Sequence, residues 1–157
     1  MPPTFASPHF SYVELTRSQV AARDGLDNTP PPPALACLAD LCAHVLEPLR
    51  AMFGPIHISS GFRSPPVNRA ANGASNSQHT LGQAADIEVD GVPNIVLAKF
   101  IRDHLPHDQV ILEFYSDTDP HAGWVHVSYV HDNNRHQQLV ARRGPTGKTV
   151  YSNGLPA

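Results

Sequence analysis

The chain has 157 residues, of which 41% are hydrophobic and 16% charged, and its formal net charge is −3. The hydrophobic content excludes a disordered chain despite sixteen prolines, and the dispersed, slightly acidic charge excludes the basic surface that nucleic acid or an anionic membrane requires. The length predicts a single domain over residues 1–157.

Neither a membrane span nor a leader is expected. No run approaches the roughly 20 apolar residues that cross a membrane, and Met1–Phe5 lacks a basic segment followed by an apolar one. We therefore expect synthesis in the cytoplasm without a signal peptide. Cys37 and Cys42 lie five residues apart on different faces of a predicted helix, so we expect no disulfide between them.

The N-terminal third predicts an extended lead-in followed by helices. Residues 1–12 are proline-rich, and residues 13–23 predict a short helix with Thr16 as its N-cap. Residues 24–33 end in four prolines and predict a stiff strap over the surface. The strongest helical pattern covers residues 34–53, where Pro48 should introduce a kink because its ring removes the hydrogen bond to His44. The apolar stripe of this helix consists of Leu35, Leu38, Cys42, Val45, Leu49 and Met52.

The remaining segments predict an α+β domain. Residues 56–60 alternate like a half-buried strand, and the polar, glycine-rich segment 61–77 predicts a functional loop with one helical turn at 67–71. Further strands are expected at 84–89, 109–115 and 124–130, with a final hairpin at 137–151 that turns at 144–147. Residues 93–105 predict an amphipathic helix with Val96, Phe100 and Ile101 on one side. Strands joined partly by hairpins favour a mainly antiparallel sheet.

Two short segments carry the residues best suited to chemistry, SQHTLGQAAD at 77–86 and WVHVS at 124–128. Gly82 disfavours a helix and lets the backbone turn, so His79 in a loop and Asp86 at a strand start can face one point. In the later strand, alternation places His126 and Ser128 on one side and the intervening valines on the core side.

Two imidazoles and one carboxylate with a free coordination position are the donor set of a hydrolytic zinc site. Zinc in such a site acidifies water and polarises a carbonyl group. Taken singly, His126 reads as a structural histidine and Asp86 as a cap or turn residue. The three residues His79, Asp86 and His126 together indicate a metal site.

The motifs SxHxxGxAxD and WVHVS resemble those of the zinc D-Ala-D-Ala carboxypeptidases and murein endopeptidases, which share a fold with the Hedgehog signalling domain. The small peptidases often carried by phages and prophages are the most similar branch. Weaker matches are FSYVEL at 10–15, LEPLR at 46–50, ISSGFRS at 58–64, VNRA at 67–70 and QVILE at 109–113. The resemblance covers residues 8–131, leaves 132–157 as a C-terminal extension, and implies a Hedgehog/DD-peptidase-like fold with zinc at the sheet.

The resemblance also implies roles for individual residues. One Zn²⁺ per chain would be bound by His79, Asp86 and His126. Arg63 matches the arginine that steadies the substrate or the developing oxyanion, a role that suits a permanently charged, two-donor guanidinium. The expected substrate-binding and supporting residues are Arg63, Ser77, Gln78 and Ser128.

The general base departs from the family pattern. Many relatives place an acid three residues before the last histidine ligand, where this chain has Gly123. We predict that Glu113 replaces it, because Glu113 ends a strand that should pair with the strand of His126. Asp117 and Asp119 lie in a loop and are poorer candidates, and we expect no role for the neighbouring His121.

Together these features predict a zinc peptidase that hydrolyses peptidoglycan stem peptides, either as a D-Ala-D-Ala-type carboxypeptidase or as a murein endopeptidase. We expect a monomer that acts on the cell wall, as a phage or prophage lysis protein (an endolysin) or virion protein. Because Gly123 replaces the usual acid, two alternatives stay open. They are a non-catalytic zinc-containing module that binds the cell wall and a structural component of a phage particle.

Overall fold

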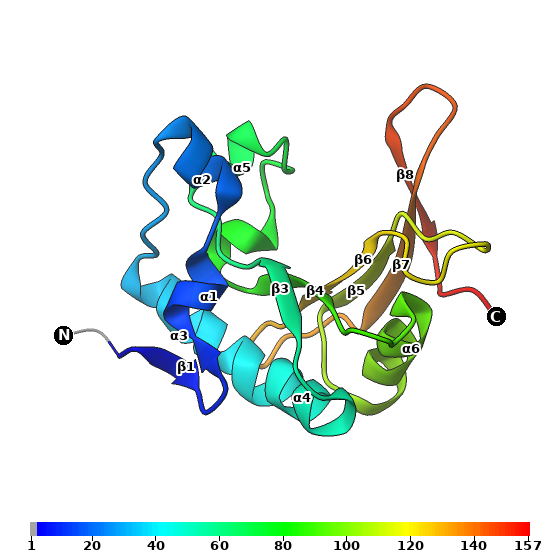
Figure 1. The fold of residues 1–157 in the computed structure, drawn as a ribbon, viewed down its shortest axis with the longest axis horizontal. Coiled ribbons are helices and arrows are strands. Elements are labelled where there is room, and N and C mark those ends of the chain that lie inside the picture. Colours follow the sequence, from blue (N-terminus) through cyan, green and yellow to red (C-terminus); the bar gives the residue numbers. More distant parts are fainter. Residues whose placement is uncertain (1–2) are drawn as a thin grey trace.

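A six-stranded sheet with strand order β3-β4-β6-β5-β7-β8 organises the molecule (Figure 1). The computed structural model describes residues 3–157. The strands are β3 (His57–Ser60), β4 (Ala84–Glu88), β5 (Gln109–Glu113), β6 (Trp124–Ser128), β7 (Gln137–Arg143) and β8 (Thr149–Asn153). Every neighbouring pair is antiparallel except β5 and β7, which are parallel. The predicted α+β class with a mainly antiparallel sheet is therefore confirmed.

The first residues differ from the prediction. Strands β1 (Phe5–Ser7) and β2 (Phe10–Ser11) form a separate two-stranded sheet within the expected extended lead-in. The single helix expected at 13–23 is wrong, because two helices occur, α1 (Tyr12–Thr16) and α2 (Gln19–Asp24). Ser11 and Ser18 are their N-caps. Thr16 caps neither helix, because its hydroxyl donates to the Tyr12 carbonyl at 2.7 Å.

The long helix is interrupted just before Pro48 rather than simply kinked. It consists of α3 (Pro32–Leu41), a π-helical turn η1 (Cys42–Leu46) and α4 (Glu47–Phe53). The amide of Glu47 donates to the Cys42 carbonyl five residues back, which accommodates the missing amide of Pro48. The extra residue of the π turn rotates α4. Met52, predicted on the buried stripe, is 61% exposed, and Phe53 packs against the core.

The prolines before this helix have two roles. The chain is extended only as far as Pro31, and Pro32 and Pro33 occupy the first turn of α3. Proline is tolerated there because the first amides of a helix have no intrahelical partner. The predicted strap over 24–33 is therefore shorter at both ends, because Asp24 still belongs to α2 and Pro32 already belongs to α3. Cys37 and Cys42 are both free, and Cys42 is completely buried in the core.

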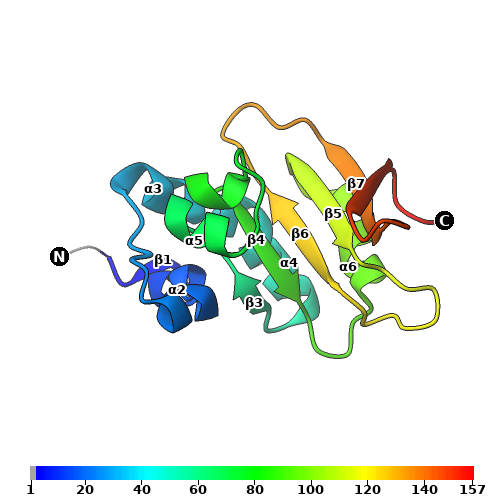
Figure 2. The same cartoon turned by 90° about the horizontal axis from the view of Figure 1, so that it is seen from above.

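One face of the sheet and the helices beneath it form the hydrophobic core. Looking onto the sheet, Figure 2 shows β4, β6, β5 and β7 side by side, with α4 and α6 (Asn94–His104) behind them. The strand residues on this face are Ile87, Val110, Leu112, Val125, Val127 and Val140. The buried side of α6 carries Leu97, Ala98 and Ile101, whereas Val96 is 45% exposed, so the predicted grouping of Val96 with Ile101 is wrong.

The segment between β3 and β4 is more regular than predicted. It contains α5 (Pro65–Ala70), which starts two residues before the expected turn because Ser64 caps it and proline fits its first position. It also contains a 3-10 turn, η2 (Gln78–Leu81), which carries His79. Gly82 ends this turn with φ +73°, a left-handed conformation that glycine adopts readily, as expected from the sequence.

The predicted C-terminal hairpin is present as β7 and β8, and it rises at the opposite edge of the sheet from α2 and α5 but on the same face (Figure 1). Residues 144–148 form its turn, in which the Gly144 amide donates to the Lys148 carbonyl at 2.7 Å. Within residues 3–157, none of the helices is both long and apolar enough to span a bilayer.

Candidate metal centre

The sheet face opposite the core brings the predicted ligands together. Asp86 on β4 is the direct cross-strand partner of His126 on β6, and His126 is paired on its other side with Ile111 on β5. Because side chains alternate along a strand, these three residues share a face while Val125 and Val127 point into the core. Asp86 lies in the middle of β4 rather than at its start.

The donor atoms of the three residues are spaced as a zinc ion requires. The Asp86 Oδ1 atom lies 3.0 Å from His126 Nδ1 and 3.4 Å from His79 Nε2. Ligand atoms about 2.0–2.2 Å from a tetrahedral zinc are separated by about 3.3 Å. All three donor atoms lie within 4.8 Å of one another, and the two rings meet edge to face with centroids 5.1 Å apart. Two nitrogens and one carboxylate oxygen are also the donors that zinc prefers.

Hydrogen bonds fix the orientation of His79. Its Nδ1 lies 2.7 Å from the carbonyl oxygen of Gly61. A carbonyl only accepts, so Nδ1 carries a hydrogen, and Nε2, on the side of Asp86, is the ring nitrogen that can bind a metal. The Ser77 hydroxyl accepts from the His79 amide at 3.2 Å, and the Arg63 amide donates to the His79 carbonyl at 3.1 Å. A metal-binding histidine is usually held through its other ring nitrogen in this way.

The three side chains are buried, and their charges are arranged for a cation. His79, Asp86 and His126 are between 3% and 9% exposed. Burial alone would raise the pKa of Asp86, but the adjacent His79 and His126 rings outweigh it and hold that pKa well below the usual range. Asp86 is therefore an ionised carboxylate facing two imidazoles, and this donor set fits Zn²⁺.

A cavity of about 760 Å³ opens over the three residues. Four of the residues predicted to act at the site line it: Arg63, Ser77, Gln78 and Glu113. Ser128 does not line it, because the turn before β5 covers this residue. Ser128 is completely buried, its hydroxyl accepts from the Gln109 amide at 3.0 Å, and its carbonyl accepts from the Asp108 amide at 2.8 Å.

Arg63 is held against the metal site by its neighbours. Its Nε donates to the Ser60 hydroxyl at 3.0 Å, and its Nη2 lies 3.4 Å from Asp86 Oδ2. Its Nη1 donates to the side-chain oxygen of Asn68 at 3.3 Å. A guanidinium has five N–H donors, so these contacts leave donors that can bind a further oxygen atom.

Glu113 lies at the end of β5, opposite Trp124 on β6, as the predicted strand pairing requires. Burial raises the pKa of its carboxyl to about 7, and the charge of Asp86 adds to this effect while His126 and Arg63 oppose it. A carboxylate with a pKa near neutrality is well suited to exchange protons. By contrast, Asp117, Asp119 and His121 do not line the cavity.

Gly123 has a structural reason to lack a side chain. Its φ is +71°, and a Cβ built there would collide with the carbonyl oxygen of Glu113. An acid at position 123 would require a different backbone for the end of β5. The backbone of Glu113, the residue that we predict as the base, therefore leaves no room for an acidic side chain at position 123.

We therefore expect Gly123→Ala to destabilise the protein by more than about 2 kcal/mol, because left-handed strain of about 1–2 kcal/mol and a backbone collision act together. Gly91→Ala is the matched control, since Gly91 has φ +76° but open space around its Cβ. Urea denaturation of both variants measures the difference. Equal losses of stability would show that the collision with Glu113 is relieved without cost.

Two buried polar residues at the site were not predicted. Asn68 is 3% exposed, and it accepts from Arg63 and donates to the Ala74 carbonyl at 2.8 Å. It thereby connects Arg63 to the loop after α5, which lines the cavity. Asp108 is 2% exposed and accepts from Gln78 Nε2 at 2.9 Å and from Arg135 Nη2 at 2.7 Å. Arg135 follows far along the sequence, so no local spacing indicates this pair.

We expect Asp108→Asn to destabilise the protein by about 2 kcal/mol. The change weakens the buried charge-assisted hydrogen bonds of Asp108 with Arg135 and with Gln78, which precedes His79. Asp103→Asn is the matched control, since Asp103 forms an exposed ion pair with Arg102 at 2.7 Å and its replacement should change the free energy of unfolding far less. The two free energies of unfolding at neutral pH give the comparison. Equal effects would contradict a structural role for Asp108.

Comparisons with known proteins agree with these features. A sequence model described as Peptidase M15 matches residues 8–128. The zinc D-Ala-D-Ala carboxypeptidase of Streptomyces albus G is 39% identical over 61 residues, which cover 38% of this chain and 24% of that protein. The aligned region thus spans about a quarter of the length of this relative.

Proposed function

The chain belongs to the peptidase M15 family, and from this premise we propose that it is a zinc-dependent peptidase that hydrolyses peptide bonds in peptidoglycan stem peptides. The observation that carries the proposal is the His79, Asp86 and His126 cluster on the floor of a cavity that Arg63 and Glu113 also line. The name of the matched carboxypeptidase, which acts on D-Ala-D-Ala, supports the substrate class. The protein would then act on the cell wall.

Three residues would hold the metal, namely His79 through Nε2, His126 through Nδ1 and Asp86 through its carboxylate. When bound, zinc supplies a Lewis acid for the scissile carbonyl and lowers the pKa of water. The hydrogen bond from His79 to Gly61 and the strand pairing of Asp86 with His126 keep these donors in place, because strands and fixed rings restrict side-chain motion.

Glu113 is proposed as the general base. Its carboxylate would accept a proton from the attacking water as the new C–O bond forms. It would then return that proton to the leaving amine as the C–N bond breaks. Its pKa near 7, which results from burial, allows both transfers near neutral pH.

Arg63 is proposed to bind the oxygen of the scissile carbonyl or a neighbouring carboxylate. The bonds to Ser60 and Asn68 fix the plane of its guanidinium before the substrate arrives. Donors that are already oriented stabilise developing negative charge without reorganisation during the reaction. Ser77 and Gln78 act indirectly, because they position the turn that carries His79.

The experiment uses the full chain loaded with zinc and incubated with purified murein and with a synthetic stem pentapeptide ending in D-Ala-D-Ala. Mass spectrometry should detect free D-Ala if the terminal bond is cut, or new internal peptide ends in murein if an internal bond is cut. A chelator should abolish both products, and added zinc should restore them. Binding to murein without any new peptide end would instead support the non-catalytic wall-binding module.

A further inference from the structure

Three arginines line the cavity, and they differ in their partners. Arg63 pairs with Asp86 at 3.4 Å, and Arg135 pairs with Asp108 at 2.7 Å. Among residues 3–157, Arg143 forms no ion pair within 4.0 Å. It is therefore the arginine of the cavity whose charge is not already matched by a carboxylate of the protein.

The register of the C-terminal hairpin explains why Arg143 faces the cavity. Strand β7 runs parallel to β5, with Ala141 beside Glu113, and antiparallel to β8, with Arg143 opposite Thr149. Alternation then places Arg143 and the β8 residues Thr149 and Tyr151 on the face that carries Glu113 and His126. All of these residues line the same cavity. The hairpin lies beyond residue 128, where the match to the family model ends.

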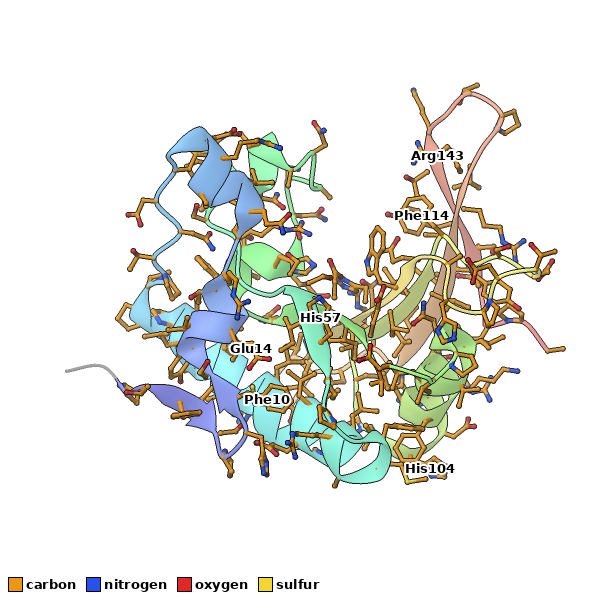
Figure 3. All side chains as sticks on the ribbon, in the orientation of Figure 1. Phe10, Glu14, His57, His104, Phe114 and Arg143 are labelled. Atoms are coloured by element: carbon orange, nitrogen blue, oxygen red, sulfur yellow. The ribbon has the colours of Figure 1, made fainter. Side chains whose placement is uncertain are left out.

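Phe114 supports the guanidinium from below. Its φ is +53°, which is rare for a bulky residue, and its amide donates to the Ala141 carbonyl at 2.7 Å. The Phe114 ring packs on Trp124 with centroids 5.4 Å apart, and the Arg143 guanidinium carbon lies 5.5 Å from the Phe114 ring centroid. Figure 3 shows Arg143 on the hairpin with Phe114 beneath it. Unusual backbone conformations of this kind concentrate at functional sites.

The guanidinium of this exposed arginine therefore lies over an aromatic ring and has unused donors. Within the described residues 3–157, its one hydrogen bond joins Nη1 to the Gly147 carbonyl at 3.3 Å. The hairpin also approaches the proposed base. Burial and the nearby charge of Glu113 both raise the pKa of the Tyr151 hydroxyl on β8. A peptide that presents a bond to Glu113 would therefore share the cavity with the hairpin.

We propose that the β7–β8 hairpin is a wall of the substrate site and that Arg143 binds a carboxylate of an acidic peptide, which makes Arg143 a specificity-determining residue. This inference rests on the proposed function, since it assigns to the hairpin the recognition of a carboxylate of the peptide substrate. Arg143 selects the substrate and takes no part in proton transfer. A guanidinium suits this task because it binds carboxylates through two parallel donors.

The matched control is the adjacent residue. Arg142 projects from the opposite face of β7 and lies over Tyr115, with its guanidinium carbon 5.8 Å from the ring centroid, and it does not line the cavity. Arg142→Gln and Arg143→Gln therefore remove the same charge from the same strand, each over an aromatic ring. The test compares these variants on a D-Ala-D-Ala stem pentapeptide and on versions in which one carboxylate at a time is converted to a carboxamide.

Arg143→Gln should raise KM for the acidic peptide by roughly fivefold, the range of a partly exposed ion pair, with kcat little changed. One carboxamide peptide should show the same rise in KM with the wild type and no further rise with Arg143→Gln. Arg142→Gln should behave like the wild type. Equal KM values for Arg143→Gln and Arg142→Gln, or no carboxylate whose amidation matters, would overturn the inference.

A binding measurement separates this inference from the proposed function. The dissociation constants of the same peptides are measured with the full-length chain by fluorescence anisotropy, in a Glu113→Gln background that prevents turnover. An Arg143-dependent preference for the acidic peptide supports the inference even where the wild type cuts nothing and the proposed function fails. Cleavage by the wild type together with identical binding of acid and amide overturns the inference and leaves the proposed function intact.

Discussion

Replacing His126 with alanine is expected to remove the bound zinc and to lower peptidase activity by about a thousandfold or more. The protein offers three donors, and Asp86 lies 3.0 Å from His126 Nδ1 and 3.4 Å from His79 Nε2. Two protein donors bind zinc too weakly to hold it against its hydration by water, so the loss of one of the three should release the metal. Zinc per chain is measured by mass spectrometry of the purified protein, and activity on the stem pentapeptide is measured in parallel.

The control is His121→Ala, which removes a histidine from the loop before β6 that does not line the cavity. Zinc content and activity should stay at wild-type values in this variant. Thermal unfolding of the metal-free proteins checks that His126→Ala is still folded. A His126→Ala protein that keeps both its zinc and its activity would exclude the proposed ligand set.

Glu113→Gln is expected to lower kcat by about a hundredfold to ten-thousandfold while zinc remains bound. Glutamine keeps the shape of the side chain but cannot accept the proton from water. Because Glu113 is half-buried at the end of β5 and is not in the metal cluster, its replacement should affect the chemistry and leave the metal in place. Steady-state kinetics on the stem pentapeptide, together with zinc content, measures both effects.

Asp119→Asn is the control for the base. Asp119 lies in the loop between β5 and β6, where its Oδ1 accepts from the His121 amide at 3.0 Å, and it does not line the cavity. Its kcat should equal that of the wild type. If Glu113→Gln kept full kcat and Asp119→Asn lost it, the assignment of the base would pass to the loop.

The convergence of His79, Asp86 and His126 could be predicted from the sequence, because local rules orient each side chain and the two motifs that carry them resemble those of a known family. Alternation along a strand puts His126 on the face opposite Val125 and Val127, and Gly82 has the positive φ that turns the chain between His79 and Asp86. The pairing of the strand of Glu113 with the strand of His126 was also predicted, and it is present. These inferences use short spacings and strong residue preferences.

The other parts of the site depend on contacts between distant segments. The parallel pairing of β7 with β5 places Arg143 over Phe114, and no residue in either strand indicates that pairing. The Asp108 network likewise depends on where the loop before β7 folds back. For Ser128, alternation correctly predicted the face of β6 on which it lies. The turn before β5, which covers Ser128, could not be predicted in the same way.

A crystal of the protein grown with zinc, measured at the zinc absorption edge, shows whether His79, Asp86 and His126 bind one ion. We expect one anomalous peak about 2.0–2.2 Å from His79 Nε2, His126 Nδ1 and a carboxylate oxygen of Asp86. The Glu113 carboxylate should face the remaining coordination position, within reach of a water there. A peak elsewhere, or none at these three residues in a zinc-saturated crystal, would exclude them as the zinc ligands.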